Sequence, residues 1–154
     1  MIVTLRVECV WGMHLTEECV RAIEMDDAAS LLDLHAAIQE SVGFDYDHLF
    51  EFFAGRNFRN RKLFFVDEGH WEYEADALDQ VTLQQVYPLP KSLKLYYHFD
   101  FGDDWYFEIR KSRKKPVPAE PGVCYPRVVE RIGRNPPQYG EDEEEWEVDE
   151  EEPE

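Results

Sequence analysis

The chain has 154 residues, of which 44% are hydrophobic and 14% aromatic, so it can bury a sizeable core and favours one domain over two. It carries 34 acidic and 16 basic residues, for a formal net charge of −18, which argues against a protein that coats duplex nucleic acid through a basic surface. No apolar run approaches the roughly 20 residues that cross a membrane.

The N-terminal segment is predicted to form two strands joined by a turn. Residues 2–10 alternate between apolar and polar side chains, a pattern typical of a half-buried strand and not of a signal peptide. Gly12 suits the turn that follows because glycine adopts positive φ without strain. A second alternating segment predicts a strand at residues 16–25.

An amphipathic helix is predicted next. Asp26 or Asp27 is expected to cap its start. Apolar residues and one histidine then recur at the spacing of a single helical face, namely at Leu31, Leu34, His35, Ile38 and Val42. Gly43 is well placed to end the helix in the left-handed conformation.

The middle of the chain is predicted to contain short elements. Residues 48–54 are rich in phenylalanine and predict a third strand, and residues 62–66 predict a short fourth one. The polar residues 55–61 between them are expected to form a loop. Residues 82–86 predict a helix of one or two turns that ends before Pro88.

The strongest strand pattern comes later and predicts a β-hairpin. Residues 92–99 and 104–110 are rich in aromatic and β-branched side chains, which favour strands. The residues between them, 100–103, contain a glycine and two aspartates and are expected to form the turn. This hairpin is therefore the best-defined element of the second half of the chain.

The C-terminal part changes character. Residues 110–115 place five cations in six positions, and residues 127–132 are expected to form a short helix. Residues 141–154 hold 11 acidic and no basic residues, which predicts a disordered tail. We expect this tail to fold back and partly screen the basic cluster, through interactions that salt weakens.

This order of elements predicts an α+β fold. We expect a β-grasp-like mixed sheet with one main helix packed on one face, followed by the late aromatic β-hairpin and the disordered acidic tail. Residues 1–140 are expected to form the single domain and residues 141–154 the tail.

Three segments of the chain carry a resemblance to a known family. They are the helix and following strand (residues 31–39 and 48–52), the D-F-G-D-x-W string at 100–105, and the late motifs Tyr125-Pro126-Arg127 and Pro136-Pro137. In this order they resemble the plasmid pRiA4b ORF-3-like family, over roughly residues 1–140. The resemblance implies a small α+β domain found on plasmids and chromosomes and described as a passenger of mobile elements such as transposons. It implies no established activity.

The chain departs from the family pattern in two places. The family often has a Trp-Arg pair on its second strand, where this chain has Val20-Arg21. The resemblance therefore places Arg21 among the candidate binding residues. The late Pro136-Pro137 motif is not followed by the acid and glycine pair that the family usually shows, so a role that depends on that loop is not expected here.

The aspartates of the hairpin turn invite a metal hypothesis. Asp100, Asp103 and Asp104 are hard oxygen donors that a turn could bring onto one divalent cation. With His35 or His48 as a base beside Asp103, they could form a metal-dependent catalytic site. The structural interpretation is favoured instead, because aspartates also bond the free backbone N–H groups of their own turn.

We expect a non-enzymatic protein-interaction module without a cofactor. Its binding residues would lie on the hairpin and beside the helix, at Tyr97, Asp100, Asp103, Asp104, Trp105 and Arg21. The expected partner is another protein, and a basic one would suit the acidic tail, with Trp146 as an anchor. An alternative is an acidic regulator that imitates nucleic-acid charge and occupies a nucleic-acid-binding protein.

The cysteine pattern favours a reducing compartment. Cys9, Cys19 and Cys124 form an odd set without a C-x-x-C pair, so a disulfide framework is not expected. Cys9 and Cys19 fall on the predicted strands and are expected to be small core residues. We therefore expect the protein in the cytoplasm, away from membranes and without direct binding to duplex nucleic acid.

Overall fold

The computed structural model describes residues 1–46, 48–65 and 76–139. The strands are β1 (Ile2–Trp11), β2 (Val20–Asp26), β3 (Phe50–Asn57), β4 (Asn60–Phe65), β5 (Lys94–Phe99), β6 (Trp105–Lys111) and β7 (Arg127–Ile132). The helices are α1 (Leu31–Val42), α2 (Asp76–Asp79) and α3 (Leu83–Val86). The acidic tail, for which disorder was predicted, lies outside the described residues.

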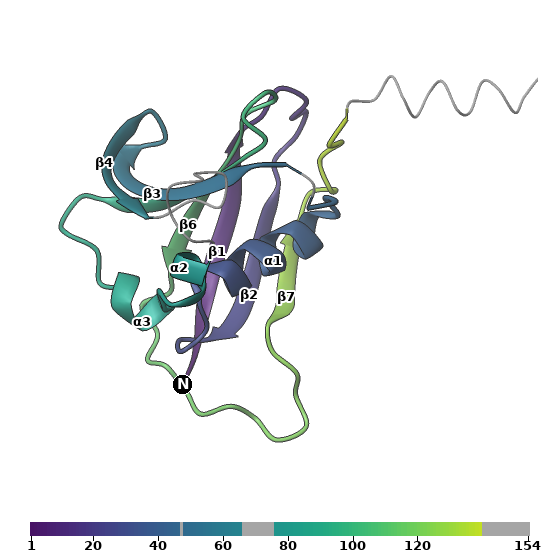
Figure 1. Ribbon diagram of the computed structural model, residues 1–154. Coiled ribbons are helices and arrows are strands. Elements are labelled where there is room, and N and C mark those ends of the chain that lie inside the picture. Colours follow the sequence, from purple (N-terminus) through teal and green to yellow (C-terminus); the bar gives the residue numbers. More distant parts are fainter. Residues whose placement is uncertain (47, 66–75, 140–154) are drawn as a thin grey trace, which may run out of the picture.

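The described strands form one sheet in the order β4-β3-β5-β6-β1-β2-β7, with α1 lying across one face of it (Figure 1). Each strand pairing between them is antiparallel. The prediction of a mixed sheet is therefore wrong, although the α+β class and the single main helix are confirmed. None of the described helices has the length and apolarity needed to span a membrane.

Helix α1 begins and ends with well-formed caps. Ser30 is the N-cap: its backbone is extended, its side chain accepts a hydrogen bond from the Asp33 amide, and the Asp33 carboxylate accepts one from the Ser30 amide. The predicted cap at Asp26 or Asp27 is wrong because the Asp26 carboxylate accepts from the Ala28 amide, in a turn before the helix. Gly43 ends the helix at φ 73°, as predicted.

The core lies between α1 and the inner face of the sheet. Alternate residues of the central strands fill it, among them Leu95, Tyr97 and Phe99 of β5 and Trp105, Phe107 and Ile109 of β6. The predicted hairpin is confirmed, since Leu95 pairs with Ile109 and Phe99 with Trp105. Cys9 and Cys19 are both buried with free thiols, as expected.

Two predicted elements differ in the structure because polar strands lie at the sheet edges. The expected loop at 55–61 is the end of β3 and the start of β4, and the chains approach so closely that a Cβ at Gly55 would lie 1.6 Å from the Asn60 carbonyl oxygen. The expected helix at 127–132 is edge strand β7, in which Arg127 Nε donates to Glu24 Oε1 at 2.7 Å. Exposure on an edge hides the alternation that marks a strand.

Candidate functional site

Asp100 and Asp104 of the D-F-G-D-D-W turn have structural roles in the turn itself. Asp100 and Asp104 both adopt left-handed backbone conformations, with φ of 65° and 56°. The Asp100 Oδ1 atom accepts from the Gly102 amide at 3.1 Å and from the Asp103 amide at 3.2 Å. This is the arrangement of an Asx turn, and it supports the structural interpretation of Asp100.

The same aspartates pair with separate histidines instead of meeting at one point. The pairs are His48 Nε2–Asp100 Oδ2 at 3.6 Å, His14 Nε2–Asp103 Oδ2 at 3.4 Å and His98 Nε2–Asp104 Oδ1 at 2.8 Å. Within the described ranges, no three His, Cys, Asp or Glu side chains are placed to hold a metal ion. The turn therefore does not assemble the three-aspartate site that the metal hypothesis needs.

His35 lies in the core and away from the aspartates that the catalytic hypothesis joined to it. Its Nδ1 atom is 2.6 Å from the Tyr97 hydroxyl, and its ring stacks on Phe50 with centroids 3.7 Å apart. Burial lowers the pKa of His35 to about 4, so the ring is neutral at neutral pH. His35 thus positions Tyr97 and packs α1 on the sheet.

Two of the expected binding residues on the hairpin are core residues. Tyr97 and Trp105 are both 0% exposed, so their side chains offer no surface to a partner. Trp105 packs against Phe44, with ring centroids 5.1 Å apart, and fills the space beside Gly12. Phe101, at the tip of the turn, is the exposed aromatic residue of this hairpin in the described structure.

The outer face of the sheet carries a buried polar network that no pattern in the sequence predicts. His98 Nδ1 lies 2.8 Å from Glu51 Oε2, and its Nε2 lies 2.8 Å from Asp104 Oδ1. Each ring nitrogen of His98 therefore faces a carboxylate oxygen. The His98 ring is also stacked on Tyr106, and Arg61 donates to Glu51 and to the Tyr106 hydroxyl. The network links β3, β4, β5 and β6.

The network predicts a loss of stability in acid. Burial acts to raise the pKa of Glu51, but hydrogen bonds from His98 and Arg61 outweigh it and hold the pKa below its ordinary value of 4.5. A lowered pKa in the folded state stabilises the protein above the unfolded-state pKa, and this stability is lost as the pH falls through the folded-state pKa. In urea denaturation, Glu51→Gln should have a lower free energy of unfolding than the native chain at pH 7. This difference in the free energy of unfolding should narrow between pH 5 and pH 3, near and below the unfolded-state pKa of a glutamate. A difference in the free energy of unfolding that stays constant with pH would contradict stabilisation by the ionised Glu51 carboxylate.

Arg21 is buried and serves as a structural anchor. It is 1% exposed, and its guanidinium donates to the Ser41 carbonyl at 2.9 Å, the Ile132 carbonyl at 3.1 Å and Asn135 Oδ1 at 2.8 Å. These bonds join β2, the end of α1, β7 and the segment before Pro136. Arg21 therefore orders this region and does not itself face a ligand.

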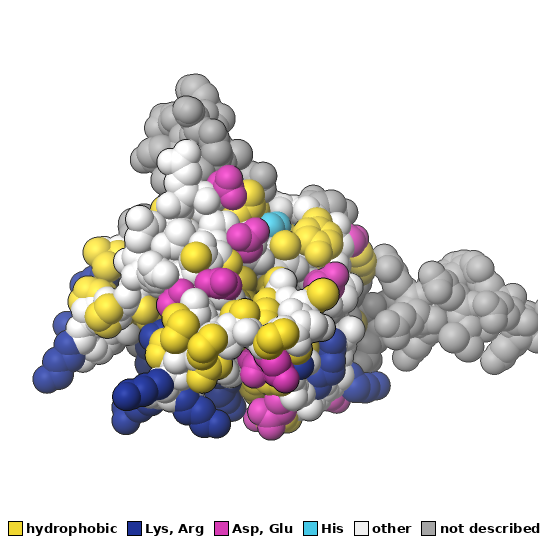
Figure 2. Space-filling model, turned by 90° about the horizontal axis from the view of Figure 1, so that it is seen from below, with side chains coloured by type: hydrophobic (Ala, Val, Ile, Leu, Met, Phe, Trp, Pro, Cys, Tyr) yellow, Lys and Arg dark blue, Asp and Glu magenta, His cyan; other side chains and the backbone are white. Residues whose placement is uncertain are grey.

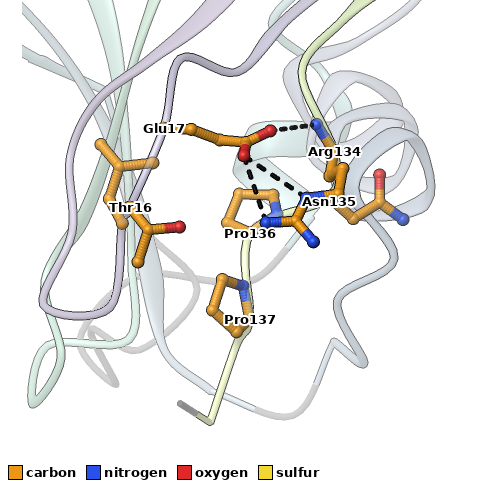
Figure 3. A pocket seen from close by; sticks show the side chains of 7 residues that line it. Thr16, Glu17, Arg134, Asn135, Pro136 and Pro137 are labelled. Carbon is orange, nitrogen blue, oxygen red and sulfur yellow. Dashed lines mark hydrogen bonds and ion pairs between the residues drawn. The ribbon is translucent and has the colours of Figure 1, made fainter. Parts of the chain in front are cut away.

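A pocket of about 410 Å³ lies beside that segment. Its walls come from residues 15–17 and 134–137, and Figure 3 shows Glu17 directed at Arg134 across it. The Glu17 carboxylate accepts from the Arg134 amide at 2.9 Å and from its Nη2 atom at 3.2 Å, and these hydrogen bonds lower the pKa of Glu17. The two charges in the wall satisfy each other, so the pocket offers no unmatched charge to a ligand.

A second and larger hollow carries a strong unbalanced charge. We call it the basic groove: it is lined by residues 87–94 and 109–113 and has a volume of about 760 Å³. The cations in its lining are Lys91, Lys94, Arg110, Lys111 and Arg113. None of its described lining residues is acidic. Figure 2 shows Lys and Arg side chains gathered beside hydrophobic ones along one margin of this end of the molecule.

Some of these cations are already paired and some are available. Glu108, which is not part of the lining, accepts from Arg110 Nε at 2.6 Å and lies 3.7 Å from Lys94 Nζ. Lys91, Lys111 and Arg113 form no ion pair within 4.0 Å with the part of the chain that the structure describes, although Lys111 acts on Asp27 electrostatically over a longer distance. The apolar part of the lining is Pro88, Leu89, Pro90 and Leu93. The groove therefore combines excess positive charge with apolar contact area.

The comparisons with known proteins agree with the fold and name a family. A solved structure of a protein of unknown function from Methanosarcina mazei Go1 is similar to this chain, with a TM-score of 0.66 and 24% identity, covering 99% of this chain and 84% of that one. This likeness shows the fold. No curated protein matches the chain. The family model described as plasmid pRiA4b ORF-3-like protein matches residues 3–147, which confirms the resemblance seen in the sequence. The chain therefore belongs to the plasmid pRiA4b ORF-3-like family.

Proposed function

We propose that this chain is a protein-interaction module that binds an acidic peptide segment of a partner protein in the basic groove. The observation that carries the proposal is the charge of the groove: five cations and no described acidic side chain line it, in a chain whose net charge is −18. Three of those cations form no ion pair with described residues. Binding carboxylates there would give them partners.

The apolar lining favours a peptide over a nucleic acid. Prolines and leucines can contact the apolar side chains of a peptide while the cations bind its carboxylates. A nucleic-acid strand is bound more often by aromatic rings on which bases stack. Tyr87 is the aromatic residue of the described lining, and its hydroxyl is held by the Ile109 carbonyl at 3.2 Å. The excess of acidic residues elsewhere also repels a long polyanion.

Charge reversal in the groove is expected to abolish this binding. The variant Lys91→Glu, Lys111→Glu, Arg113→Glu should bind a fluorescent 12-residue peptide of Glu and Asp with two leucines at least about tenfold more weakly, because three favourable charge contacts become repulsive. Fluorescence anisotropy at two salt concentrations measures this, and the affinity of the native chain should fall as salt rises.

The matched control reverses three exposed cations outside the groove. Arg56→Glu, Arg59→Glu, Lys62→Glu changes the net charge by the same amount but should bind more tightly than the groove variant. If both variants lose the same affinity for the peptide, binding depends only on the overall charge of the protein and not on the groove. Tighter binding of a 12-nucleotide oligothymidine than of the peptide would overturn the choice of partner.

A further inference from the structure

We infer that the acidic segment of this same chain, residues 141–154, occupies the basic groove and competes there with the partner peptide. The inference rests on the proposed function and identifies the competitor for that site. It follows from three observations: the composition of the segment, the state of the cations nearest to its start, and the length of chain available.

The composition of the segment complements the groove. It contains 11 acidic and no basic residues, with Trp146 and Val148 as its large apolar residues. The groove presents the opposite charge beside an apolar lining of proline and leucine. An acidic peptide with spaced apolar residues is the chemistry that the proposed function assigns to the partner, so the chain carries a competitor of its own.

The cations close to the start of the segment are already engaged. Arg127 donates to Glu24, Arg131 to the Ser41 carbonyl and Arg134 to Glu17. Their hydrogen-bonding groups are therefore partly occupied within the folded chain. Lys91, Lys111 and Arg113 of the groove have no such ion pair among described residues, so the groove is a better electrostatic target than these three arginines.

The segment is long enough to reach the groove. Tyr139, the last described residue, donates from its hydroxyl to Asp45 Oδ2 at 2.5 Å. In Figure 1 the described chain ends at one end of the body, while α3, next to the groove, lies at the other end. β5 runs between these two ends, and its 6 residues span about 20 Å at ~3.3 Å per residue. Fourteen residues span up to about 46 Å when extended. A tether of this length gives an effective concentration in the millimolar range.

The test compares the native full-length chain with a neutral-tail variant. In this variant, every Glu and Asp of residues 141–154 becomes Gln or Asn. The neutral-tail chain should bind the Glu/Asp peptide about tenfold more tightly than the native chain in low salt, because no tethered competitor remains. The difference should shrink in 0.5 M salt, where the Debye length is only a few ångströms.

Backbone amide spectra locate the effect. Between the native chain and the neutral-tail variant, the amide chemical shifts should differ at residues 91–94 and 110–113 and be the same at residues 15–17. The changes should be independent of protein concentration, since the contact is within one chain. Changes that grow with concentration would assign the occupant to a second copy and overturn the inference.

A further variant separates docking from general repulsion. Trp146→Ser with Val148→Ser keeps all 11 acidic residues of the segment, so repulsion of the peptide is preserved. If the segment docks, this variant should bind the peptide more tightly than the native chain. If this variant binds the peptide with the same affinity as the native chain, the segment acts only through long-range charge repulsion, and the inference is overturned.

The outcomes distinguish the two proposals. If neither the native nor the neutral-tail chain binds the peptide, the proposed function fails. If both bind it equally well, the groove does bind acidic peptides but the chain's own segment does not occupy it.

Discussion

Replacing Trp105 by alanine is expected to lower the free energy of unfolding by about 3–5 kcal/mol, the range measured for buried aromatic residues. The side chain is 0% exposed and lies at the first position of β6, between the sheet and the segment after α1. A Cβ at Gly12 would lie 2.1 Å from its Cε3 atom, so the chain on that side packs directly against the ring. Urea denaturation measures the loss as a lower midpoint at unchanged slope.

Two variants serve as controls for Trp105. Phe101→Ala removes a ring that is 41% exposed, and it should reduce stability by less than about 1 kcal/mol. Trp105→Phe should lose less than Trp105→Ala, because the buried indole N–H has no hydrogen-bond partner among the described residues and its removal relieves an unpaired donor. A Trp105→Ala loss below about 1 kcal/mol would show that the ring is not part of the core.

The elements that could be predicted carry a local signal. β1 and α1 each bury a regular face, so their periodicity is visible in the residues themselves. The β5–β6 hairpin is marked instead by its aromatic and β-branched residues, because β5 is buried on both of its faces. β7 is mostly exposed at the sheet edge, and no such face marks it in the sequence. The direction of strand pairing has no local pattern at all, which is why an antiparallel sheet was predicted as a mixed one.

The candidate site was predictable only where it is local. Residues 110–115 are visible as a basic cluster, but Lys91 and Lys94 join them only through the register of the hairpin. Since Leu95 pairs with Ile109, Lys94 comes to lie across from Arg110. In the same way, the sequence marks Asp104 as a candidate binding or metal-ligating residue, whereas its partner His98 and the second carboxylate, Glu51, are brought together by the pairing of β3 with β5.

The largest expected effect outside the aromatic core belongs to Arg21. Arg21→Met keeps most of the side-chain volume but removes the donors to the Ser41 and Ile132 carbonyls and to Asn135 Oδ1. The Ser41 carbonyl keeps its hydrogen bond from Arg131, whereas the Ile132 carbonyl and Asn135 Oδ1 lose theirs. A buried acceptor left without a hydrogen bond costs about 1–3 kcal/mol, so we expect a loss of roughly 2–4 kcal/mol after partial relaxation. Hydrogen exchange should also become faster in β7, since Arg21 holds that edge strand through Ile132.

Arg131 provides a matched control for Arg21. Its Nη1 atom donates to the same Ser41 carbonyl at 2.8 Å, but its side chain is exposed, so water can replace the lost bond in Arg131→Met. We expect that variant to lose less than about 1 kcal/mol. The loss of stability in Arg21→Lys should lie between those of Arg21→Met and Arg131→Met, because one ammonium group cannot make all the hydrogen bonds of a guanidinium group. Equal losses for Arg21→Met and Arg131→Met would contradict the assignment of Arg21 as the buried anchor, because burial is what separates the two arginines.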